Sequence, residues 1–429
     1  MRKIYNMILK NRLISNHILQ VHQKQRGRIL VITGARQTGK TTLASRVFDD
    51  HLLLSMDDPM LRPEFSRLTA RDWINRYPFA VIDEIQKLPA LMESIKACYD
   101  SSPDVRYVLL GSSQIMLLKG IRESLAGRAA IQELYPLTLP ELMTTDWSEP
   151  ARPSRLIRWL AENPRNDPRD YLEGVVSINE RYAAAKQSWE YYLNWGGMPA
   201  LTHADYSDED RRKWLEDYFA SYLQRDLSDL GRLNDLEPFI RAQQAIALRT
   251  SKLINFTELG RLAGVSSPTA KKFMRYLELS YQVILLPAFF RNPEKRLAKQ
   301  PKVVFLDPGV RRGILRKSGV LDGLEWESAV IAEIFKQVKT ADLPINLYHL
   351  RTLDGREVDL LLESEQGFIA IECKMTTNPA RNDFQAMRNL EALLDKPLLA
   401  GLVVCNEDTV RRFDGGIPLY SVPGAWLLS

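Results

Sequence analysis

Cysteine is scarce in this chain of 429 residues, and long apolar runs are missing from it. The three cysteines, Cys98, Cys373 and Cys405, stand far apart and without the spacing of metal ligands. This excludes a disulfide framework and argues against a zinc site. No run of about 18 apolar residues occurs, and residues 1–25 contain no apolar segment that ends in a small-residue cleavage site. These absences predict a cytoplasmic protein without a membrane span.

A large excess of charge of one sign is also missing. Lysine and arginine number 58 against 53 aspartate and glutamate residues, which leaves a formal net charge of +5. A surplus of this size is compatible with nucleic-acid contact but does not indicate it. Hydrophobic residues make up 45% and charged residues 26% of the chain, as in soluble globular proteins, and the length predicts two or three domains.

A glycine-rich loop follows an apolar run at residues 28–33. The segment Gly34-Ala35-Arg36-Gln37-Thr38-Gly39-Lys40-Thr41 matches the pattern G-x-x-x-x-G-K-[ST] between a predicted strand and a predicted helix. The glycines let backbone N–H groups approach phosphates, the lysine neutralises the β and γ oxygens, and the threonine is placed to ligate magnesium. The expected cofactors are therefore ATP and Mg²⁺. The expected ATP contacts are Gly34, Ala35, Arg36, Gln37, Thr38, Gly39, Lys40, Thr41 and Thr42.

Three further strand candidates follow, at residues 52–56, 79–83 and 106–110. Helical stretches such as 42–48 and 91–100 separate them. Strands and helices that alternate at this spacing predict an α/β fold, in which helices cover both faces of a parallel sheet.

Candidate catalytic residues stand at the ends of these elements. Asp83 and Glu84 end the second of the three strands, so we expect Asp83 to hold magnesium through water and Glu84 to polarise the attacking water. Ser112 and Ser113 end the next strand and either contact the γ-phosphate or attacking water or simply cap the strand. Arg128 follows a short helix and either reaches a neighbouring subunit's γ-phosphate or is a solvated surface arginine.

The whole set of motifs resembles a family of prokaryotic AAA-superfamily ATPases whose C-terminal half is a domain of unknown function. The segments that carry the resemblance are Gly34 to Thr42, Val81-Ile82-Asp83-Glu84-Ile85-Gln86, Gly111-Ser112-Ser113, Ser124-Leu125-Ala126-Gly127-Arg128 with Tyr135-Pro136-Leu137, Gly196-Gly197-Met198-Pro199, Tyr222-Leu223-Gln224-Arg225-Asp226-Leu227, Arg356-Glu357-Val358-Asp359 and Ile371-Glu372-Cys373-Lys374. They occur in the family's order and cover nearly the whole chain. The resemblance implies that Arg128 takes the arginine-finger position and that Gly197-Met198-Pro199 is the family's lid motif.

The same resemblance implies four regions. These are an AAA-type P-loop ATPase core with a helical lead-in (1–145), an insertion and helical lid (146–240), a winged-helix-like segment (241–320) and an α/β domain similar to restriction endonucleases (321–429). Residues 146–169 are rich in proline, arginine and asparagine, and we expect them to form a loop or an insertion.

Two basic segments of the third region are candidates for nucleic-acid contact. Residues 255–266 and the helix at 267–279 suggest a helix-turn-helix, and Ser266, Lys271, Lys272 and Arg275 would meet phosphates or a groove. Packing of this element against protein is the alternative. The second segment runs from Arg291 to Lys302 and is either a wing that touches phosphate or a solvated loop. Its basic residues include Lys295, Arg296, Lys299 and Lys302.

The last region carries an acidic constellation. Asp359, followed by Glu372 and Lys374 on the next strand, reproduces the core of the PD-(D/E)XK nuclease fold, with Glu327 on the preceding helix as the additional acid. Val358 stands where that fold has proline. Two carboxylates on adjacent strands can ligate magnesium, and a nearby lysine can activate water. The domain is either a magnesium-dependent nuclease or a relic that only binds.

Three functions therefore remain open. The favoured one is an ATP-hydrolysing protein that acts on DNA as a homo-oligomeric motor or processing factor, for which a hexamer-type ring is the expected assembly. The second is a nucleotide-switched regulator or scaffold whose nuclease-like domain only binds. The third is an ATP-gated nuclease.

Overall fold

The structure is a computed structural model that describes residues 8–111, 124–172, 180–229, 236–352 and 355–429, with the side chains of 220–229 left out. The chain divides into two compact units. The N-terminal unit contains Asn11–Pro136 and Leu279–Tyr281, and the C-terminal unit contains Met1–Lys10, Leu137–Glu278 and Gln282–Ser429. Within the described ranges, no helix has the length and apolar character needed to cross a membrane.

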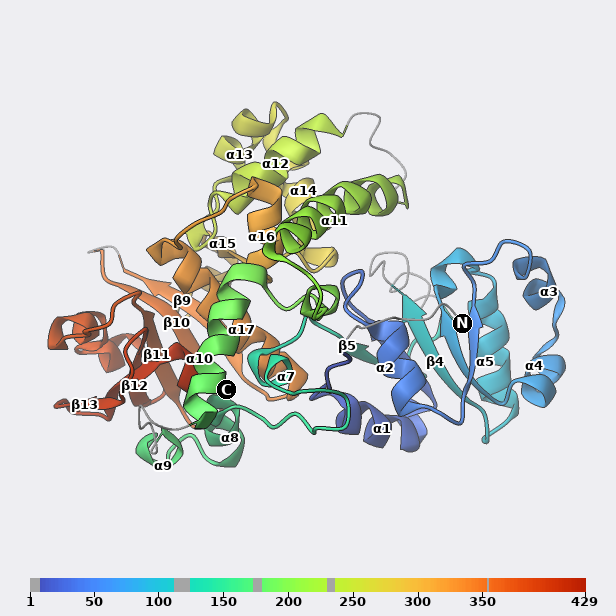
Figure 1. Ribbon diagram of the computed structural model, residues 1–429, viewed down its shortest axis with the longest axis horizontal. Helices are drawn as coiled ribbons and strands as arrows, with labels where there is room; N and C mark the ends of the chain where they lie inside the picture. The colour runs from blue at the N-terminus through green and yellow to red at the C-terminus, as the bar shows by residue number, and fades with distance from the viewer. Residues whose placement is uncertain (1–7, 112–123, 173–179, 230–235, 353–354) are drawn as a thin grey trace. The chain divides into compact units, whose positions relative to one another are not determined.

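The N-terminal unit is a five-stranded parallel sheet flanked by helices, which confirms the predicted fold class (Figure 1). The strand order is β2-β3-β4-β1-β5. The strands are β1 (Ile29–Thr33), β2 (Leu52–Ser55), β3 (Phe79–Asp83), β4 (Arg106–Gly111) and β5 (Ala129–Glu133). The helices are α1 (Ser15–Gln23), α2 (Lys40–Val47), α3 (Arg62–Arg67), α4 (Ala70–Arg76) and α5 (Leu91–Ser101).

The register of this sheet brings the predicted site residues to one edge. Thr33 at the end of β1 pairs with Gly111 at the end of β4, and Ile82 of β3 pairs with Leu109 of β4. Parallel strands end at a common edge, so the loop after β1 and the acidic end of β3 lie on the same side of the sheet. All five residues of β1 are buried, as expected for a central strand.

The described helices of the C-terminal unit occur along its whole length, and most of them precede its large sheet in the chain. They are α7 (Leu139–Leu142), α8 (Arg155–Glu162), α9 (Arg169–Leu172), α10 (Glu180–Trp195), α11 (Asp208–Asp229), α12 (Glu237–Ala247), α13 (Phe256–Ala263), α14 (Ser267–Leu279), α15 (Pro293–Ala298), α16 (Pro308–Leu315), α17 (Gly323–Thr340) and α18 (Gly424–Leu427). Residues 146–169 were predicted to form a loop or an insertion, and the loop alternative is wrong for Arg155–Glu162, which form α8. Ser154 caps this helix by accepting a hydrogen bond from the Ile157 backbone N–H, and its apolar face, which includes Leu156 and Trp159, is buried.

Residues 237–305 form a small helical layer with a three-stranded antiparallel sheet. The sheet has the order β6-β8-β7, built from β6 (Lys252–Leu253), β7 (Val283–Leu286) and β8 (Lys302–Phe305). Helices α13 and α14 are joined by a turn at Gly264, which has a φ of 70° and therefore favours glycine. Phe239 and Phe273 pack edge to face in the core of this layer.

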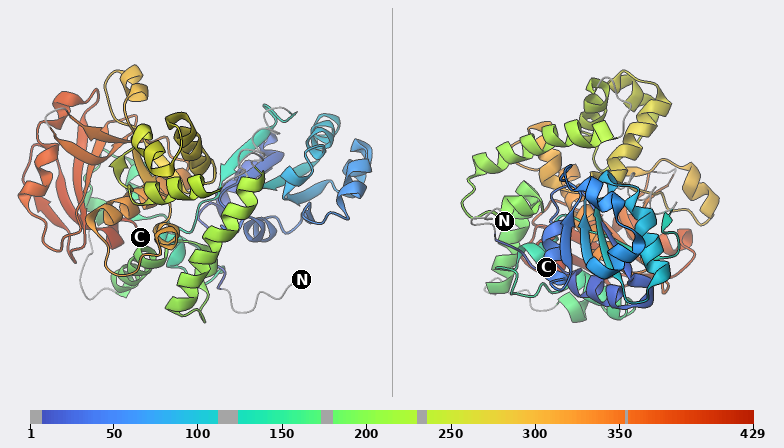
Figure 2. Two further views of the ribbon diagram at one scale, coloured as in Figure 1. Left: turned by 90° about the horizontal axis from the view of Figure 1, so that it is seen from above. Right: turned by 90° about the vertical axis from the view of Figure 1, so that its right-hand side faces the viewer.

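The final part of the chain forms a six-stranded mixed sheet, drawn as the orange to red arrows in Figures 1 and 2. Its order is β13-β14-β12-β11-β10-β9. The strands are β9 (Asn346–Arg351), β10 (Glu357–Glu363), β11 (Phe368–Cys373), β12 (Leu398–Cys405), β13 (Arg411–Phe413) and β14 (Leu419–Pro423). Helix α17 contacts both β11 of this sheet and β8 of the smaller sheet, and its buried residues therefore occur on all its faces.

Candidate functional site

The glycine-rich loop joins β1 directly to α2. A Cβ atom at Gly34 would lie 2.1 Å from the carbonyl oxygen of Leu134, so only glycine fits there. Gly39, with a φ of 89°, begins the turn into α2, and Gln37 holds a φ of 61° that costs a residue with a side chain some strain. This tight course leaves the loop between a buried strand and a helix N-terminus, the arrangement that binds phosphate.

The Lys40 side chain folds back over the loop. Its ammonium donates hydrogen bonds to the carbonyl oxygens of Gly34 at 2.9 Å and Ala35 at 2.7 Å. The Thr38 hydroxyl also donates to the Ala35 carbonyl, at 2.9 Å. The loop carbonyls therefore keep the ammonium charge within the loop, where it can exchange these bonds for phosphate oxygens.

Thr41 and Asp83 meet at the edge of the sheet. The Thr41 hydroxyl donates to Asp83 Oδ2 at 2.8 Å, although the two residues are 42 positions apart. A hydroxyl and a carboxylate are the hard oxygen ligands that Mg²⁺ accepts, and Mg²⁺ takes few protein ligands and keeps several waters. These residues fit a magnesium ion bound together with nucleotide phosphates.

Glu84 follows Asp83 in a left-handed conformation, with a φ of 52°. Its backbone N–H donates to Asp83 Oδ1 at 3.0 Å, and its carboxylate accepts a hydrogen bond from the Gln86 side-chain amide. Uncommon backbone conformations cluster at functional sites, and this one stands beside the carboxylate that is predicted to bind magnesium. Glu84 is placed next to the predicted magnesium ligand, as its proposed role requires.

Ser112 and Ser113 lie outside the described residues, so their predicted contacts with the γ-phosphate or attacking water stay predictions. Arg128 is described. It forms a two-point ion pair with Asp100, with Nε to Oδ1 at 2.9 Å and Nη2 to Oδ2 at 3.0 Å. A role as an arginine finger would require the guanidinium to exchange Asp100 for a phosphate.

Two side chains near the loop belong to no sequence motif and were not predicted as site residues. The buried Arg12 guanidinium donates to the carbonyl oxygens of Thr38 at 2.8 Å and Tyr135 at 2.6 Å, which ties the loop to the segment after β5. The Tyr281 hydroxyl donates to Glu133 Oε1 at 3.0 Å. Tyr281 follows α14 closely in the chain yet belongs to the N-terminal unit, so only long-range folding brings it to this site.

The predicted acids of the C-terminal unit also come together. Asp359 on β10 accepts a hydrogen bond from the Cys373 backbone N–H at 2.9 Å, which holds it beside β11. The Lys374 ammonium lies 2.8 Å from Glu372 Oε2 and 3.9 Å from Asp359 Oδ2. Glu327 reaches the same cluster from α17, as predicted from its place in the sequence.

A second lysine lies among these acids. The Lys302 ammonium is 2.7 Å from Glu327 Oε1, 3.0 Å from Glu357 Oε1 and 3.8 Å from Asp359 Oδ1. The prediction that Lys302 belongs to an exposed wing or loop is wrong, because its side chain is only 1% exposed. Sequence alone could not reveal this, since an isolated lysine at the start of a short strand has no local pattern that signals burial.

The electrostatics of the cluster follow from this crowding. Burial and then the Asp359 carboxylate raise the pKa of Glu327 to about 7 and the pKa of Glu372 to about 8. Burial alone would lower the pKa of Lys302 and Lys374, but the neighbouring carboxylates outweigh it and raise both values. The cluster therefore favours the charged form of both lysines and the protonated form of the two glutamates.

This arrangement does not fit a metal ion. Within the described ranges, no group of three or more His, Cys, Asp and Glu side chains is arranged to hold one. Glu372 Oε1 is buried without a hydrogen-bond partner, yet the cations that the carboxylates contact are lysines. Glu327, Asp359 and Glu372 thus lie together around Lys302 and Lys374 instead of around an open cation site.

The remaining basic residues of the segment 291–302 divide into two kinds. Arg296 is half-buried, and its guanidinium lies over the Phe289 and Tyr348 rings. Its Nη1 atom lies 3.6 Å from Glu363 Oε2, so the guanidinium charge is already paired with a carboxylate. Lys295 and Lys299 are exposed and line a cavity of about 1110 Å³. Other residues that line this cavity include Phe290, Arg291, His349 and Arg351. The cavity therefore combines exposed cations with an aromatic ring.

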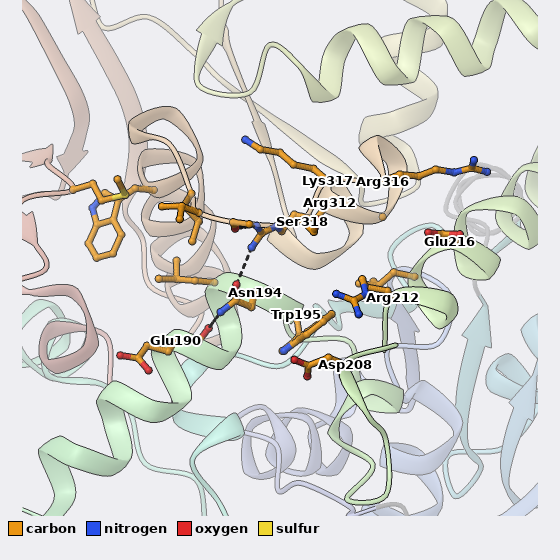
Figure 3. A pocket seen from close by; sticks show the side chains of 18 of the residues that line it. Glu190, Asn194, Trp195, Asp208, Arg212, Glu216, Arg312, Arg316, Lys317 and Ser318 are labelled. Carbon is orange, nitrogen blue, oxygen red and sulfur yellow. Dashed lines mark hydrogen bonds between the residues drawn. The ribbon is translucent and has the colours of Figure 1, made fainter. Parts of the chain in front are cut away.

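A separate cavity of about 800 Å³ lies among α10, α11 and α16 (Figure 3). Figure 3 shows Arg312 bonded to Asn194, with the Oδ1 atom of Asn194 accepting at 2.9 Å. The lining includes charged side chains of both signs, Glu190, Asp208, Arg212, Glu216, Arg312, Arg316 and Lys317. The lining therefore does not favour one sign of ligand charge by composition alone.

On α14, the apolar and basic residues lie on opposite faces. Ala270, Phe273, Met274 and Leu277 are buried in the core of the small helical layer. Lys271, Lys272 and Arg275 are exposed, which leaves a basic face on the helix that was predicted to contact nucleic acid.

Three stretches of the chain match known protein families. Residues 26–143 match the AAA domain, residues 186–320 match a domain of unknown function (DUF8612), and residues 322–424 match another domain of unknown function (DUF4143). Uncharacterized protein Rv2008c of Mycobacterium tuberculosis and Uncharacterized protein Mb2031c of Mycobacterium bovis are each 27% identical over 426 residues. That similarity covers 94% of this chain and 82% of each relative.

Two solved structures resemble this chain with low sequence identity and a TM-score below 0.5. The Walker-type ATPase PABY2304 of Pyrococcus abyssi has 13% identity and a TM-score of 0.46, over 72% of this chain and 98% of that one. The ORC2 protein of Aeropyrum pernix has 13% identity and a TM-score of 0.21, over 77% of this chain and 92% of that one. The AAA-domain match, the complete phosphate-binding loop and the parallel sheet that presents it identify residues 26–143 as an AAA-type P-loop ATPase domain.

Proposed function

We propose that this chain hydrolyses ATP with magnesium and couples hydrolysis to work on DNA as a homo-oligomer. The observation that carries the first part is the 2.8 Å contact between the Thr41 hydroxyl and Asp83. It joins the phosphate-binding loop to the acidic end of β3 at one edge of the sheet. Magnesium bound by Thr41, and through water by Asp83, would supply charge neutralisation at the β and γ phosphates.

The chain's own groups then have separate tasks. Backbone N–H groups of the loop and the Lys40 ammonium bind and orient the phosphates. Glu84 accepts a hydrogen bond from the attacking water and so positions it in line with the γ-phosphate. Because this work is positioning and electrostatics, loss of one carboxylate spares binding while it slows turnover.

The test compares Glu84→Gln with the unaltered chain and with Glu64→Gln. Glu64 is an exposed residue of α3 and provides a matched change of charge in the same unit. We expect Glu84→Gln to bind ATP with unchanged affinity and to hydrolyse it about 10²–10⁴-fold more slowly, whereas Glu64→Gln behaves as the unaltered chain. Normal turnover in Glu84→Gln would remove Glu84 from the mechanism.

Action on DNA is proposed from the exposed cations of the C-terminal unit. The basic face of α14 and the cavity lined by Lys295 and Lys299 supply charges that phosphates bind. The replacement of Lys271 and Lys272 by glutamine should weaken binding to DNA and reduce its dependence on salt, as measured by fluorescence anisotropy. Lys24→Gln, an exposed lysine of the N-terminal unit, is the control. An identical salt dependence in all three proteins would contradict a DNA contact through α14.

One observation favours a second candidate, the nucleotide-switched regulator or scaffold whose C-terminal domain only binds. The acids of that domain contact Lys302 and Lys374, which supports a domain that binds without cleaving. This candidate predicts slow hydrolysis that DNA does not change, together with an oligomer whose size depends on the nucleotide. Light scattering with and without ATP, beside hydrolysis assays, distinguishes the two.

A further inference from the structure

Lys302 is held in place by a strand with neighbours on both sides. β8 lies at the centre of its sheet, where Lys302 pairs with Leu253 of β6 and Leu286 of β7. The strand also contacts α17, which carries Glu327. The small sheet and α17 together therefore fix the position of the ammonium, whereas a lysine on a surface loop can move.

The ammonium also has the surroundings of a bound cation. Two carboxylate oxygens lie at hydrogen-bond distance, 2.7 Å for Glu327 and 3.0 Å for Glu357, and Asp359 lies at 3.8 Å. These carboxylates come from α17 and β10, so separate elements converge on one nitrogen atom. A lysine ammonium has three N–H donors, which can serve two or three carboxylates at once.

A divalent ion would need the same space. Magnesium requires oxygen ligands at about 2.0–2.1 Å around a single point. The Lys302 ammonium lies between Glu327 Oε1 and Asp359 Oδ1, so an ion that binds these two oxygens together would compete with it. Two cations at that point would repel each other across a few ångströms in a buried site.

We propose that Lys302 is the resident cation of this cluster and keeps Glu327 and Asp359 from binding a divalent metal. The amine belongs to β8, so a metal can enter only if β8 moves away from α17 or if Lys302 is replaced. The ammonium thereby holds the small sheet against the C-terminal sheet through charge. The acids whose sequence pattern suggests a metal-dependent nuclease are thus paired with the protein's own lysine.

The first experiment measures Mn²⁺ binding by the full-length, nucleotide-free chain, because free Mn²⁺ is read directly from its electron paramagnetic resonance signal. The unaltered chain and Asp359→Asn should bind the same amount of Mn²⁺, since Asp359 holds none. If the unaltered chain binds one more Mn²⁺ than Asp359→Asn, the proposal is overturned. Divalent-dependent nicking of plasmid DNA by the unaltered chain that Asp359→Asn abolishes would overturn it as well.

The second experiment removes the ammonium. Lys302→Met should bind one Mn²⁺ more than the unaltered chain, and Lys302→Met/Asp359→Asn should lose that additional ion. Lys336→Met is the matched control, because Lys336 is equally buried and pairs with Glu333 at 2.8 Å, away from the cluster. It should gain no Mn²⁺ site.

A folded Lys302→Met that gains no site, or a Lys336→Met that gains the same one, would contradict the proposal. If Lys302→Met does not fold, the comparison of the unaltered chain with Asp359→Asn decides the question. That comparison keeps the lysine in place and needs no destabilising change at the centre of the cluster.

Discussion

Replacement of Lys302 by methionine should destabilise the C-terminal unit strongly. Methionine fills a similar volume but leaves Glu327, Glu357 and Asp359 without the ammonium that lies 2.7, 3.0 and 3.8 Å from them. Removal of one partner from a buried ion pair costs about 3–5 kcal/mol, because the remaining charge is left uncompensated. The side chain is 1% exposed, so water cannot take over the role of the lysine without structural change.

A double-mutant cycle separates the ion pair from the loss of packing. Lys302→Met/Glu327→Gln removes one carboxylate charge along with the ammonium, and its free energy of unfolding should exceed that of Lys302→Met. The coupling between the two substitutions should be about 1–3 kcal/mol. The free energy of unfolding of each variant is measured by urea denaturation, with tryptophan fluorescence as the signal.

The control for this cycle is Lys299→Met, an exposed lysine three positions earlier. It should change the free energy of unfolding by no more than about 0.5 kcal/mol. If Lys302→Met costs less than about 1 kcal/mol, or if the cycle shows no coupling, the ammonium is not held by these carboxylates.

Three further predictions concern the N-terminal unit. Lys40→Ala should abolish binding of a fluorescent ATP analogue, and binding within a few-fold of the unaltered chain would mean that the loop does not hold phosphates through this ammonium. Arg128→Ala should lower hydrolysis only at protein concentrations where subunits assemble, because the guanidinium must leave Asp100 to act on a neighbour; equal loss in dilute monomer would exclude a role between subunits. Burial lowers the pKa of His22 to about 4 from its usual 6.5. Between these pH values the unfolded chain binds a proton at His22 and the folded chain does not. The free energy of unfolding therefore falls as the pH falls through this range. The full effect is about 3 kcal/mol at 1.36 kcal/mol per pH unit, and urea unfolding at pH 7 and pH 4.5 should show a smaller difference in His22→Gln than in the unaltered chain.

Local patterns in the sequence predict the N-terminal sheet well. The strand at 79–83 has the predicted bounds, and the glycine-rich loop lies between β1 and α2 as expected. Such features depend on neighbours in the chain, since apolar runs, glycines and a lysine at fixed spacing determine the strand, turn and helix. The approach of Thr41 to Asp83 follows from the parallel order of the strands.

Long-range contacts are harder to predict from these patterns. Arg12 supports the loop through two backbone carbonyl groups, and carbonyl acceptors leave no mark in the sequence. Tyr281 reaches Glu133 from a distant part of the chain. Lys302 belongs to a stretch of basic residues, and only the pairing of β8 with two other strands places it among carboxylates. The acids themselves were predictable, but the lysine that they contact was not.

The most direct test of the central claim is steady-state ATP hydrolysis with magnesium, alone and with single-stranded, duplex and branched DNA. Glu84→Gln is measured beside the unaltered chain. The account predicts magnesium-dependent hydrolysis that at least one form of DNA stimulates, and a loss of both basal and stimulated rates in Glu84→Gln. Hydrolysis that no DNA changes, or that survives in Glu84→Gln, would contradict the proposal of a DNA-coupled ATPase that works through this site.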